Sequence, residues 1–409
     1  MATITLIQNA PVSRAGTGGQ TSTVGEPSVA NTASGMFVTG NWYASRSTDG
    51  GGTWRFVSPA ATLPPANLGF CCDQTLIHVP SRQITVWLLQ YIKDEKRNTL
   101  RVAVTSDGAF GNSGWHWWDL SPDATNPAWT GEWFDYNHAA LSDRFLYVSS
   151  NVFTVGGNEW TRAVVFRIPL DALQAGARLD YDFFMTREAG SLRCTQGARD
   201  TMYFASQAGG SAIRVFRWPE SATAVSDVRV PVSAWAGGRY SAPGPDGNDW
   251  LTRCDPRITA GWVAQGQLGF MWTANRRGST RPFPYVRAVH LDESTMKVVA
   301  EPDIWNTDYA YAYPDASPNA NGEVGITLYR GGGNRLPGHA VGAWDFAAKR
   351  WALAGTRDGT HGPSDTKWGD YLTCRPDTLD PRNWIAVGCT LQGGDTQDFV
   401  EPRVVRFSS

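Results

Sequence analysis

The chain has few charged residues, no long apolar run and no sustained helical period. Only 18% of its 409 residues are charged, and the formal net charge is −2. This balance argues against a surface that binds nucleic acid or an anionic membrane. No apolar stretch approaches the roughly 18 residues that a membrane-spanning helix requires. The first residues also lack the basic and then apolar pattern of a secretory signal sequence.

Aromatic residues and glycine are abundant instead. The sequence contains 19 Trp, 13 Tyr, 17 Phe and 43 Gly. Aromatic side chains favour strands, and glycine favours turns. The best short helical candidate is 169–176. A chain of this length exceeds the usual size of one domain, unless the domain is a closed array of repeats. We therefore predict one all-β domain that spans residues 1–409.

Seven repeat units follow one another along the chain. Each begins with a short polar turn before an apolar strand, and the units lie roughly 50 to 60 residues apart, close to the length of a four-stranded propeller blade. A strand with an arginine between apolar residues recurs later in most units, as in Leu100–Val102 and Val286–Ala288. We predict a seven-bladed β-propeller; a six-bladed, sialidase-like ring is the alternative. The markers of the seven units are Glu26, Asp73, Asp135, Gln196, Asp255, Asp315 and Asp370.

The two ends of the chain complement each other. The sequence stops just after the third strand of the seventh unit, and Thr3–Ile7 alternates between apolar and polar residues as a half-buried strand does. We predict that this N-terminal strand supplies the missing fourth strand of the last blade. That arrangement closes the ring and removes two exposed sheet edges.

The segment Ser47–Trp54 fits the pattern Ser-x-Asp-x-Gly-x-Thr-Trp. In such a turn the Asp carboxylate accepts backbone N–H groups, and glycine adopts a positive φ. The segment resembles the Asp-box of the sialidase and bacterial-neuraminidase-repeat β-propellers, and 105–108 followed by Trp115 resembles a degenerate second copy. The resemblance implies a structural role for the motif, on an outer turn away from the substrate.

This superfamily includes sialidases, other glycan hydrolases, polysaccharide lyases and lectins. A sialidase would carry an arginine triad and a Phe/Tyr-Arg-Ile-Pro motif in its first strand. Phe166–Pro169 has these letters, but it lies at the outer end of the third unit. We therefore do not predict sialidase activity.

The six cysteines favour an oxidising compartment because their number is even. We predict a secreted or periplasmic protein, despite the lack of a signal sequence. Cys374 and Cys389 flank a turn and are predicted to pair across a hairpin, whereas Cys71 and Cys72 form either a vicinal disulfide or two thiols. No Cys-x-x-Cys or His-x-x-x-His spacing indicates zinc. No cofactor is predicted; calcium at the acidic turns is an open alternative, although no loop has EF-hand spacing.

In a propeller, the loops that lead into the innermost strands surround one mouth of the channel, where ligands bind. His138 is the one histidine inside a unit-opening motif, and Tyr136 lies on the same side of an extended strand. We predict His138 as general base and Tyr136 as proton donor. The alternative is a buried imidazole that bonds Asp135.

Four arginines near the openings of units four and five are predicted to bind an anionic substrate, with salt bridges to the acidic turns as the alternative. Aromatic side chains near the unit openings are predicted to stack on sugar rings, with packing between blades as the alternative. The acids Asp73 and Asp135 join the predicted substrate-binding set, with turn capping as their alternative. The other predicted contacts are Arg193, Arg199, Arg253, Arg257, Trp133 and Trp368, with Trp42, Trp250 and Trp305 as further aromatic candidates.

These residues differ from unit to unit, which favours one unique site. A lectin would repeat its binding residues blade after blade. With the family resemblance, this predicts a monomeric enzyme that cleaves an oligo- or polysaccharide at the channel mouth. It is either a glycoside hydrolase or a lyase in which His138 and Tyr136 form the acid–base pair while Arg193 and Arg253 neutralise a uronate carboxylate. A glycan-binding lectin or adhesion module is the alternative.

Overall fold

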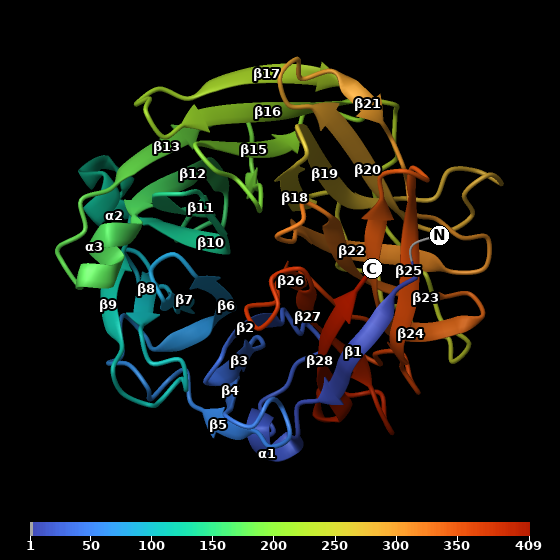
Figure 1. Cartoon of the computed structure of the whole chain (residues 1–409), viewed down its shortest axis with the longest axis horizontal. Helices are drawn as coiled ribbons and strands as arrows, with labels where there is room; N and C mark the ends of the chain where they lie inside the picture. The colour runs from blue at the N-terminus through green and yellow to red at the C-terminus, as the bar shows by residue number, and fades with distance from the viewer. Residues whose placement is uncertain (1–2) are drawn as a thin grey trace.

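The computed structural model describes residues 3–409 and arranges their strands as seven four-stranded antiparallel sheets around a central channel (Figure 1). The sheets stand like the blades of a propeller, each with its first strand nearest the channel. The prediction of seven blades is confirmed, and the six-bladed alternative is wrong. Each marker of the repeat lies at or close to the innermost strand of a different blade.

The strands of blades 1 to 4 follow the chain from the channel outward. Blade 1 comprises β2 (Ser28–Thr32), β3 (Gly35–Thr39), β4 (Ala44–Ser47) and β5 (Arg55–Val57). Blade 2 comprises β6 (Phe70–Val79), β7 (Ile84–Tyr91), β8 (Leu100–Thr105) and β9 (His116–Leu120). Blade 3 comprises β10 (Glu132–Leu141), β11 (Phe145–Thr154), β12 (Trp160–Pro169) and β13 (Asp182–Thr186). Blade 4 comprises β14 (Arg193–Cys194), β15 (Thr201–Gln207), β16 (Ala212–Pro219) and β17 (Ser226–Pro231).

Blades 5 to 7 complete the ring. Blade 5 comprises β18 (Ile258–Ala264), β19 (Gln267–Ala274), β20 (Tyr285–Asp292) and β21 (Val298–Ala300). Blade 6 comprises β22 (Ala310–Pro318), β23 (Val324–Gly332), β24 (Arg335–Asp345) and β25 (Arg350–Asp358). Blade 7 comprises β26 (Thr373–Pro376), β27 (Trp384–Leu391), β28 (Val400–Ser408) and β1 (Thr5–Pro11).

The N-terminal strand closes the ring as predicted. β1 pairs antiparallel with β28, and Thr5 lies opposite Ser408. The first and last segments of the chain therefore share one blade, which Figure 1 shows as a blue strand beside red ones. The last blade thus gains its outer strand from the start of the chain.

Apolar side chains from neighbouring blades form the core. One cluster joins Leu88 and Val102 of blade 2 to Val148 and Val164 of blade 3. Polar side chains also connect the innermost strands of neighbouring blades: the Thr75 hydroxyl donates to the Asn137 carbonyl at 3.2 Å. Equivalent bonds join Thr259 to Pro314 and Thr373 to Pro27. These hydrogen bonds fix the innermost strands of neighbouring blades relative to one another.

Helices are few and short. They are α1 (Arg14–Thr17), α2 (Pro122–Thr125) and α3 (Leu170–Ala175), with 3-10 turns η1 (Pro127–Trp129) and η2 (Gln397–Phe399). α3 falls within the helical segment predicted at 169–176. Within residues 3–409, no helix has the length and apolar character needed to cross a bilayer.

The Asp-box segment forms the turn between β4 and β5, at the outer part of blade 1. Asp49 accepts the Thr53 amide at 2.9 Å and the Thr53 hydroxyl at 2.6 Å. Both bonds lower the pKa of Asp49, and the bond from the Thr53 hydroxyl has the larger effect. Trp54 is buried against the core between blades 1 and 7. The segment therefore forms a hydrogen-bonded outer turn of blade 1.

The cysteine pairing differs from the prediction. Cys71 and Cys72 form a vicinal disulfide. Cys374 and Cys389 are both buried free thiols, so the predicted cross-strand disulfide is wrong. The reason is strand register: the residue opposite Cys374 is Ala386, and Cys389 instead lies opposite Pro402.

Candidate active site at the upper channel mouth

The innermost strands all begin at the same end of the channel, which we call the upper mouth. Four of these strands carry a register shift close to their start, and in three of them it falls at Asp73, Tyr136 and Tyr313. These residues and Glu26 have positive φ angles of 41° to 59°, a region that non-glycine residues rarely adopt. Bulges of this kind re-aim side chains and concentrate at functional sites.

An acidic pair lies at this mouth. The side chains of Glu26 and Asp73 are in hydrogen-bond contact, which requires a proton on one of the two carboxyls. Burial, followed by repulsion from Asp73 and Asp370, raises the pKa of Glu26 well above its usual range. Burial and repulsion from Asp135 raise the pKa of Asp73 to about 7. The pair therefore retains a proton near neutral pH.

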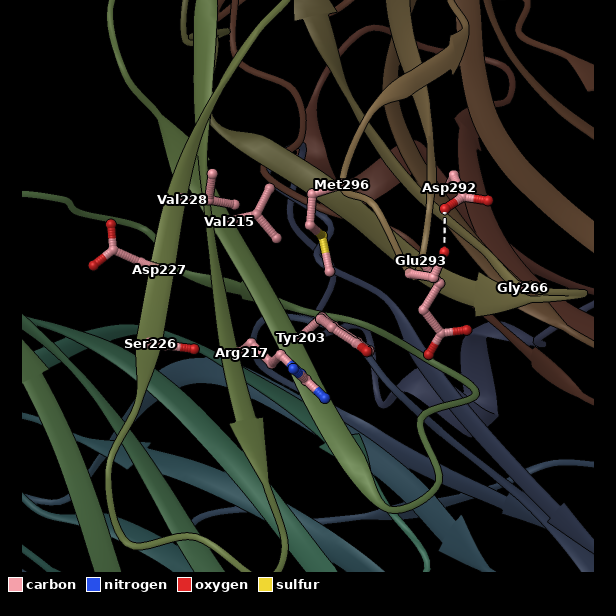
Figure 2. Close-up of a pocket in the computed structure, with 11 residues that line it drawn as sticks. Tyr203, Val215, Arg217, Ser226, Asp227, Val228, Gly266, Asp292, Glu293 and Met296 are labelled. Atoms are coloured by element: carbon pink, nitrogen blue, oxygen red, sulfur yellow. Dashed lines mark hydrogen bonds between the residues drawn. The ribbon is translucent and has the colours of Figure 1, made fainter.

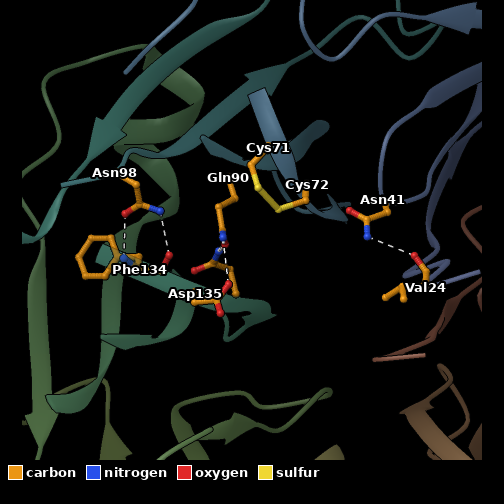
Figure 3. The surroundings of a disulfide bond; sticks show 9 residues. Val24, Asn41, Cys71, Cys72, Gln90, Asn98, Phe134 and Asp135 are labelled. Atoms are coloured by element: carbon orange, nitrogen blue, oxygen red, sulfur yellow. Dashed lines mark hydrogen bonds between the residues drawn. A yellow bond between two sulfur atoms is a disulfide. The ribbon is translucent and has the colours of Figure 1, made fainter. Parts of the chain in front are cut away.

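Asp135 adjoins this pair from blade 3. Its Oδ1 accepts the Gln90 amide at 2.9 Å, and burial raises its pKa. Gln90 lies opposite Cys72 in the β6–β7 register. Figure 3 shows the Cys71–Cys72 disulfide beside this Gln90–Asp135 bond. The vicinal disulfide thus forms part of the wall next to the acidic cluster.

Two arginines from blade 5 face the acids. Arg253 lies 3.3 Å and Arg257 3.7 Å from the Asp370 carboxylate. Arg257 also bonds Asp255 at 2.5 Å, and its guanidinium stacks 4.0 Å from the centre of the Tyr136 ring. Both guanidinium groups therefore form ion pairs with Asp370, beside a carboxyl pair that keeps a proton.

His138 and Tyr136 lie together but below the surface. Their rings are perpendicular with centroids 4.4 Å apart, and both side chains are buried. Nδ1 of His138 accepts the Arg193 guanidinium at 2.6 Å, so the partner is Arg193 rather than Asp135. Burial and the nearby Arg193 charge lower the pKa of His138 well below its ordinary value, leaving a neutral imidazole. The Tyr136 hydroxyl is buried with no hydrogen-bond partner among the described residues.

The structure divides the four predicted arginines. Arg253 and Arg257 lie together at the upper mouth, as described above. Arg193 is 3% exposed and pairs with Asp315 at 2.6 Å inside the channel, so its predicted place on the mouth is wrong. Arg199 is also misplaced, because it follows β14 down to the opposite face, where its carbonyl accepts the Asp143 amide.

The aromatic candidates divide in the same way. Trp250 and Trp368 are fully buried in a core with Tyr313, under the long segment between β17 and β18, so they offer no stacking surface. Trp133 is partly buried beneath the Lys93 ammonium, 4.4 Å from its ring centre. Trp42 is 40% exposed in the upper loop between β3 and β4.

Three residues of the site escaped the sequence prediction. Glu26 and Asp370 were recognised as repeat markers but were not placed in the predicted substrate-binding set. Trp160, 38% exposed at the start of β12, presents a second aromatic surface on the upper face. The signal for the acids was their recurrence itself, because seven strand starts converge on one opening.

A cleft of 570 Å³ between blades 4 and 5 is another candidate site (Figure 2). It lies on the outer part of the ring and is lined by Tyr203, Arg217 and Glu293 among others. Burial and then Glu293 raise the pKa of Tyr203 to about 12. This cleft brings together no buried carboxyl pair, and the part of the chain that the structure describes holds no cluster of three or more His, Cys, Asp or Glu residues suited to a metal ion.

No protein family model and no curated protein matches the sequence. Among solved structures, an α-L-arabinofuranosidase from Fusarium graminearum is 11% identical, with 98% of each chain covered and a TM-score of 0.48. An α-L-arabinanase from Cellvibrio cellulosa is 10% identical over 82% of this chain and 96% of that one, with a TM-score of 0.38. The NanB sialidase of Streptococcus pneumoniae is 10% identical over 78% and 66%, with a TM-score of 0.44. A functional proposal for this chain must therefore be based on the side chains at its own upper mouth.

Proposed function

We propose that the upper mouth hydrolyses glycosidic bonds in an oligo- or polysaccharide, with Asp73 as the general acid. One observation carries this proposal: the Glu26–Asp73 pair holds a proton near neutral pH, beside the Asp370 carboxylate, which forms ion pairs with two arginines. Glycosidases use two neighbouring carboxyl groups in this way, one as proton donor and one as base or nucleophile.

The two carboxyl groups have separate roles. Asp73 donates its proton to the oxygen of the leaving sugar as the glycosidic bond breaks. Asp370 is the second carboxylate, which either takes a proton from the attacking water or attacks the anomeric carbon itself. Asp135 is a positioning residue, since its charge raises the pKa of Asp73, and Glu26 shares the proton of the pair through its hydrogen bond to Asp73. Arg253 and Arg257 orient Asp370.

Hydrolysis fits the site better than lyase chemistry. A lyase mechanism would require Tyr136 or His138 to reach a sugar proton. The Tyr136 hydroxyl has no exposed surface, and Nδ1 of His138 already accepts from Arg193. Asp73 and Asp370, in contrast, are partly exposed. We therefore assign proton transfer to the acids rather than to the predicted His138 and Tyr136.

Sugar binding would use the surfaces around the acids. Trp42 and Trp160 present flat exposed rings that suit the apolar faces of sugars. Arg253 is half-exposed and can donate to hydroxyl or carboxylate groups. The Cys71–Cys72 disulfide supports action outside the reducing cytoplasm.

The test is cleavage of a panel of neutral and uronate-containing polysaccharides. We expect new reducing ends without ultraviolet-absorbing unsaturated products, and we expect Asp73→Asn to abolish them. Asp380→Asn is the matched control, since Asp380 lies in the lower turn between β26 and β27 and bonds Arg382. Unsaturated products that persist in Asp73→Asn would establish a lyase instead. Retention of a glycan without cleavage would establish a binding module.

A further inference from the structure

A separate cavity of 380 Å³ occupies the opposite, lower end of the channel. Innermost strands from five of the seven blades contribute to its lining, together with the turn that follows β14 and other lower turns. Most of its wall is apolar. The apolar contributors include Val29, Ile77, Leu141, Pro318 and Ile385.

Arg375 supplies a cationic patch in this wall. Its side chain is 7% exposed, and Nη1 donates to Asp315 at 2.9 Å and to the Cys374 carbonyl at 2.7 Å. Asp315 also accepts Nη2 of Arg193 at 2.6 Å. Two buried guanidinium groups therefore share one carboxylate.

The remaining groups around the cavity do not balance this charge. Asp377 is already paired with Arg406 at 2.6 Å and accepts the Asn31 amide. His78 is neutral, because burial lowers its pKa to about 4. His138, on the far side of Arg193, is neutral as well. The Arg193–Asp315–Arg375 cluster thus retains one positive charge within its direct contacts.

One donor of this cluster is also unused. Nε of Arg375 is buried and has no hydrogen-bond partner among the described residues. A buried charge and a buried unbonded donor are both costly unless a partner satisfies them. An anionic oxygen that enters the cavity would satisfy both.

We propose that the lower cavity binds a small organic monocarboxylate with an apolar body. The carboxylate bonds the free guanidinium edge of Arg375, and the body contacts the apolar wall. The volume lies within the range of small-molecule pockets. A bare inorganic anion would leave the apolar wall unfilled, and a neutral apolar molecule would leave the charge unpaired.

This site is distinct from the proposed catalytic mouth. The layer formed by His138, Arg193 and Asp315 lies between them and is buried throughout. Cleavage at the upper mouth and binding at the lower cavity are therefore separate properties, and either can fail without the other.

The experiment is calorimetric titration of the whole protein with 3-phenylpropanoate. The uncharged 3-phenylpropanamide and sodium phosphate are titrated in parallel. Two variants separate charge from shape. Arg375→Gln removes the cation and leaves Arg193 and Asp315 as a one-to-one pair. Thr378→Trp keeps the cation and fills the lower opening, where Thr378 is only partly buried.

We expect the carboxylate to bind at least about tenfold more tightly than the amide, the value of one charge-assisted bond. Each variant should lose about tenfold or more of this affinity, with thermal unfolding showing that it remains folded. Equal binding of carboxylate and amide would overturn the proposal, as would full binding by Arg375→Gln. Tight binding of phosphate, or no carboxylate binding at about 10 mM, would also overturn it.

Discussion

The two ends of the channel are built from the same strands but carry opposite charge. At the upper mouth, Glu26, Asp73 and Asp135 crowd together and their pKa values rise. At the lower end, Arg193 and Arg375 share the single carboxylate of Asp315. The upper acids reduce their mutual repulsion by holding an extra proton. The lower arginines stay charged, so they cannot reduce their repulsion in this way.

The difference teaches how a ring of blades creates chemistry. Side chains just before the innermost strands meet at the upper mouth, whereas side chains a few residues later meet inside the channel. Similar residues at equivalent places then become neighbours, although they are far apart in sequence. Like charges therefore lie close together. The acidic cluster is stabilised by binding a proton, and the cationic cluster is stabilised by binding a counter-ion.

The largest expected effect is on catalysis at the acidic end. Asp73→Asn removes the proton donor and should lower the cleavage rate by about 10²–10⁴-fold. Glu26→Gln should lower it less, because Glu26 hydrogen-bonds Asp73 and is not itself the proposed proton donor. Steady-state rates on the cleaved polysaccharide measure both, with Asp380→Asn as control. A rate for Asp73→Asn equal to that of the control would remove Asp73 from the mechanism.

The next effect concerns stability at the cationic end. Asp315→Asn leaves two buried guanidinium groups without a carboxylate and should destabilise the fold by about 3–5 kcal/mol. Arg375→Gln leaves a balanced pair and should cost far less. Denaturant unfolding of the two variants gives the comparison. Equal losses would mean that the lower cluster carries no excess charge.

A smaller effect is a shift in the pH profile of cleavage. Asp73 donates a proton only below its pKa of about 7, so the rate should fall as the pH rises through that value. Asp135→Asn removes a charge that raises this pKa, and the falling limb should move to lower pH. Rates measured from pH 4 to 9 give both limbs. An unchanged limb in Asp135→Asn would contradict the proposed coupling.

The smallest effect is on the pH dependence of stability. The pKa of Asp73 is about 7 when folded and 3.8 in its reference state, so the folded protein holds the extra proton between these values. Stability contributed by Asp73 therefore decreases as the pH rises from about 4 through 7. Asp73→Asn lacks this dependence, and its Tm should rise relative to wild type over that range. Thermal scans at three pH values suffice, and a constant Tm difference would speak against the raised pKa.

The sequence predicted the ring because repetition is a local signal. The polar turns recur at a steady spacing, and the incomplete last unit pointed to closure by β1. The depth of a residue along the channel was not accessible in this way. Arg193 and Arg199 have the same places relative to their unit as Arg253 and Arg257. However, Arg193 lies in the short strand β14 and is buried, and Arg199 follows this strand toward the opposite face.

The acidic site was partly visible for the same reason. Asp73 and Asp135 were predicted to bind substrate, while Glu26 and Asp370 were named only as repeat markers. The raised pKa values of Glu26, Asp73 and Asp135, and the ion pairs of Asp370, arise only when blades 1, 2, 3, 5 and 7 meet. The cysteine pairing failed because a hairpin turn in the sequence does not fix which residues lie opposite each other.

The most direct test of the account is the pKa of the Asp73 carboxyl group itself. Carbon-13 NMR titration of protein labelled at aspartate side chains, assigned with Asp73→Asn, measures it in the folded state. The account predicts a midpoint near 7 that falls when Asp135 is replaced by Asn. A midpoint close to the ordinary value of 3.8 would contradict it, because the upper mouth would then hold no proton to donate.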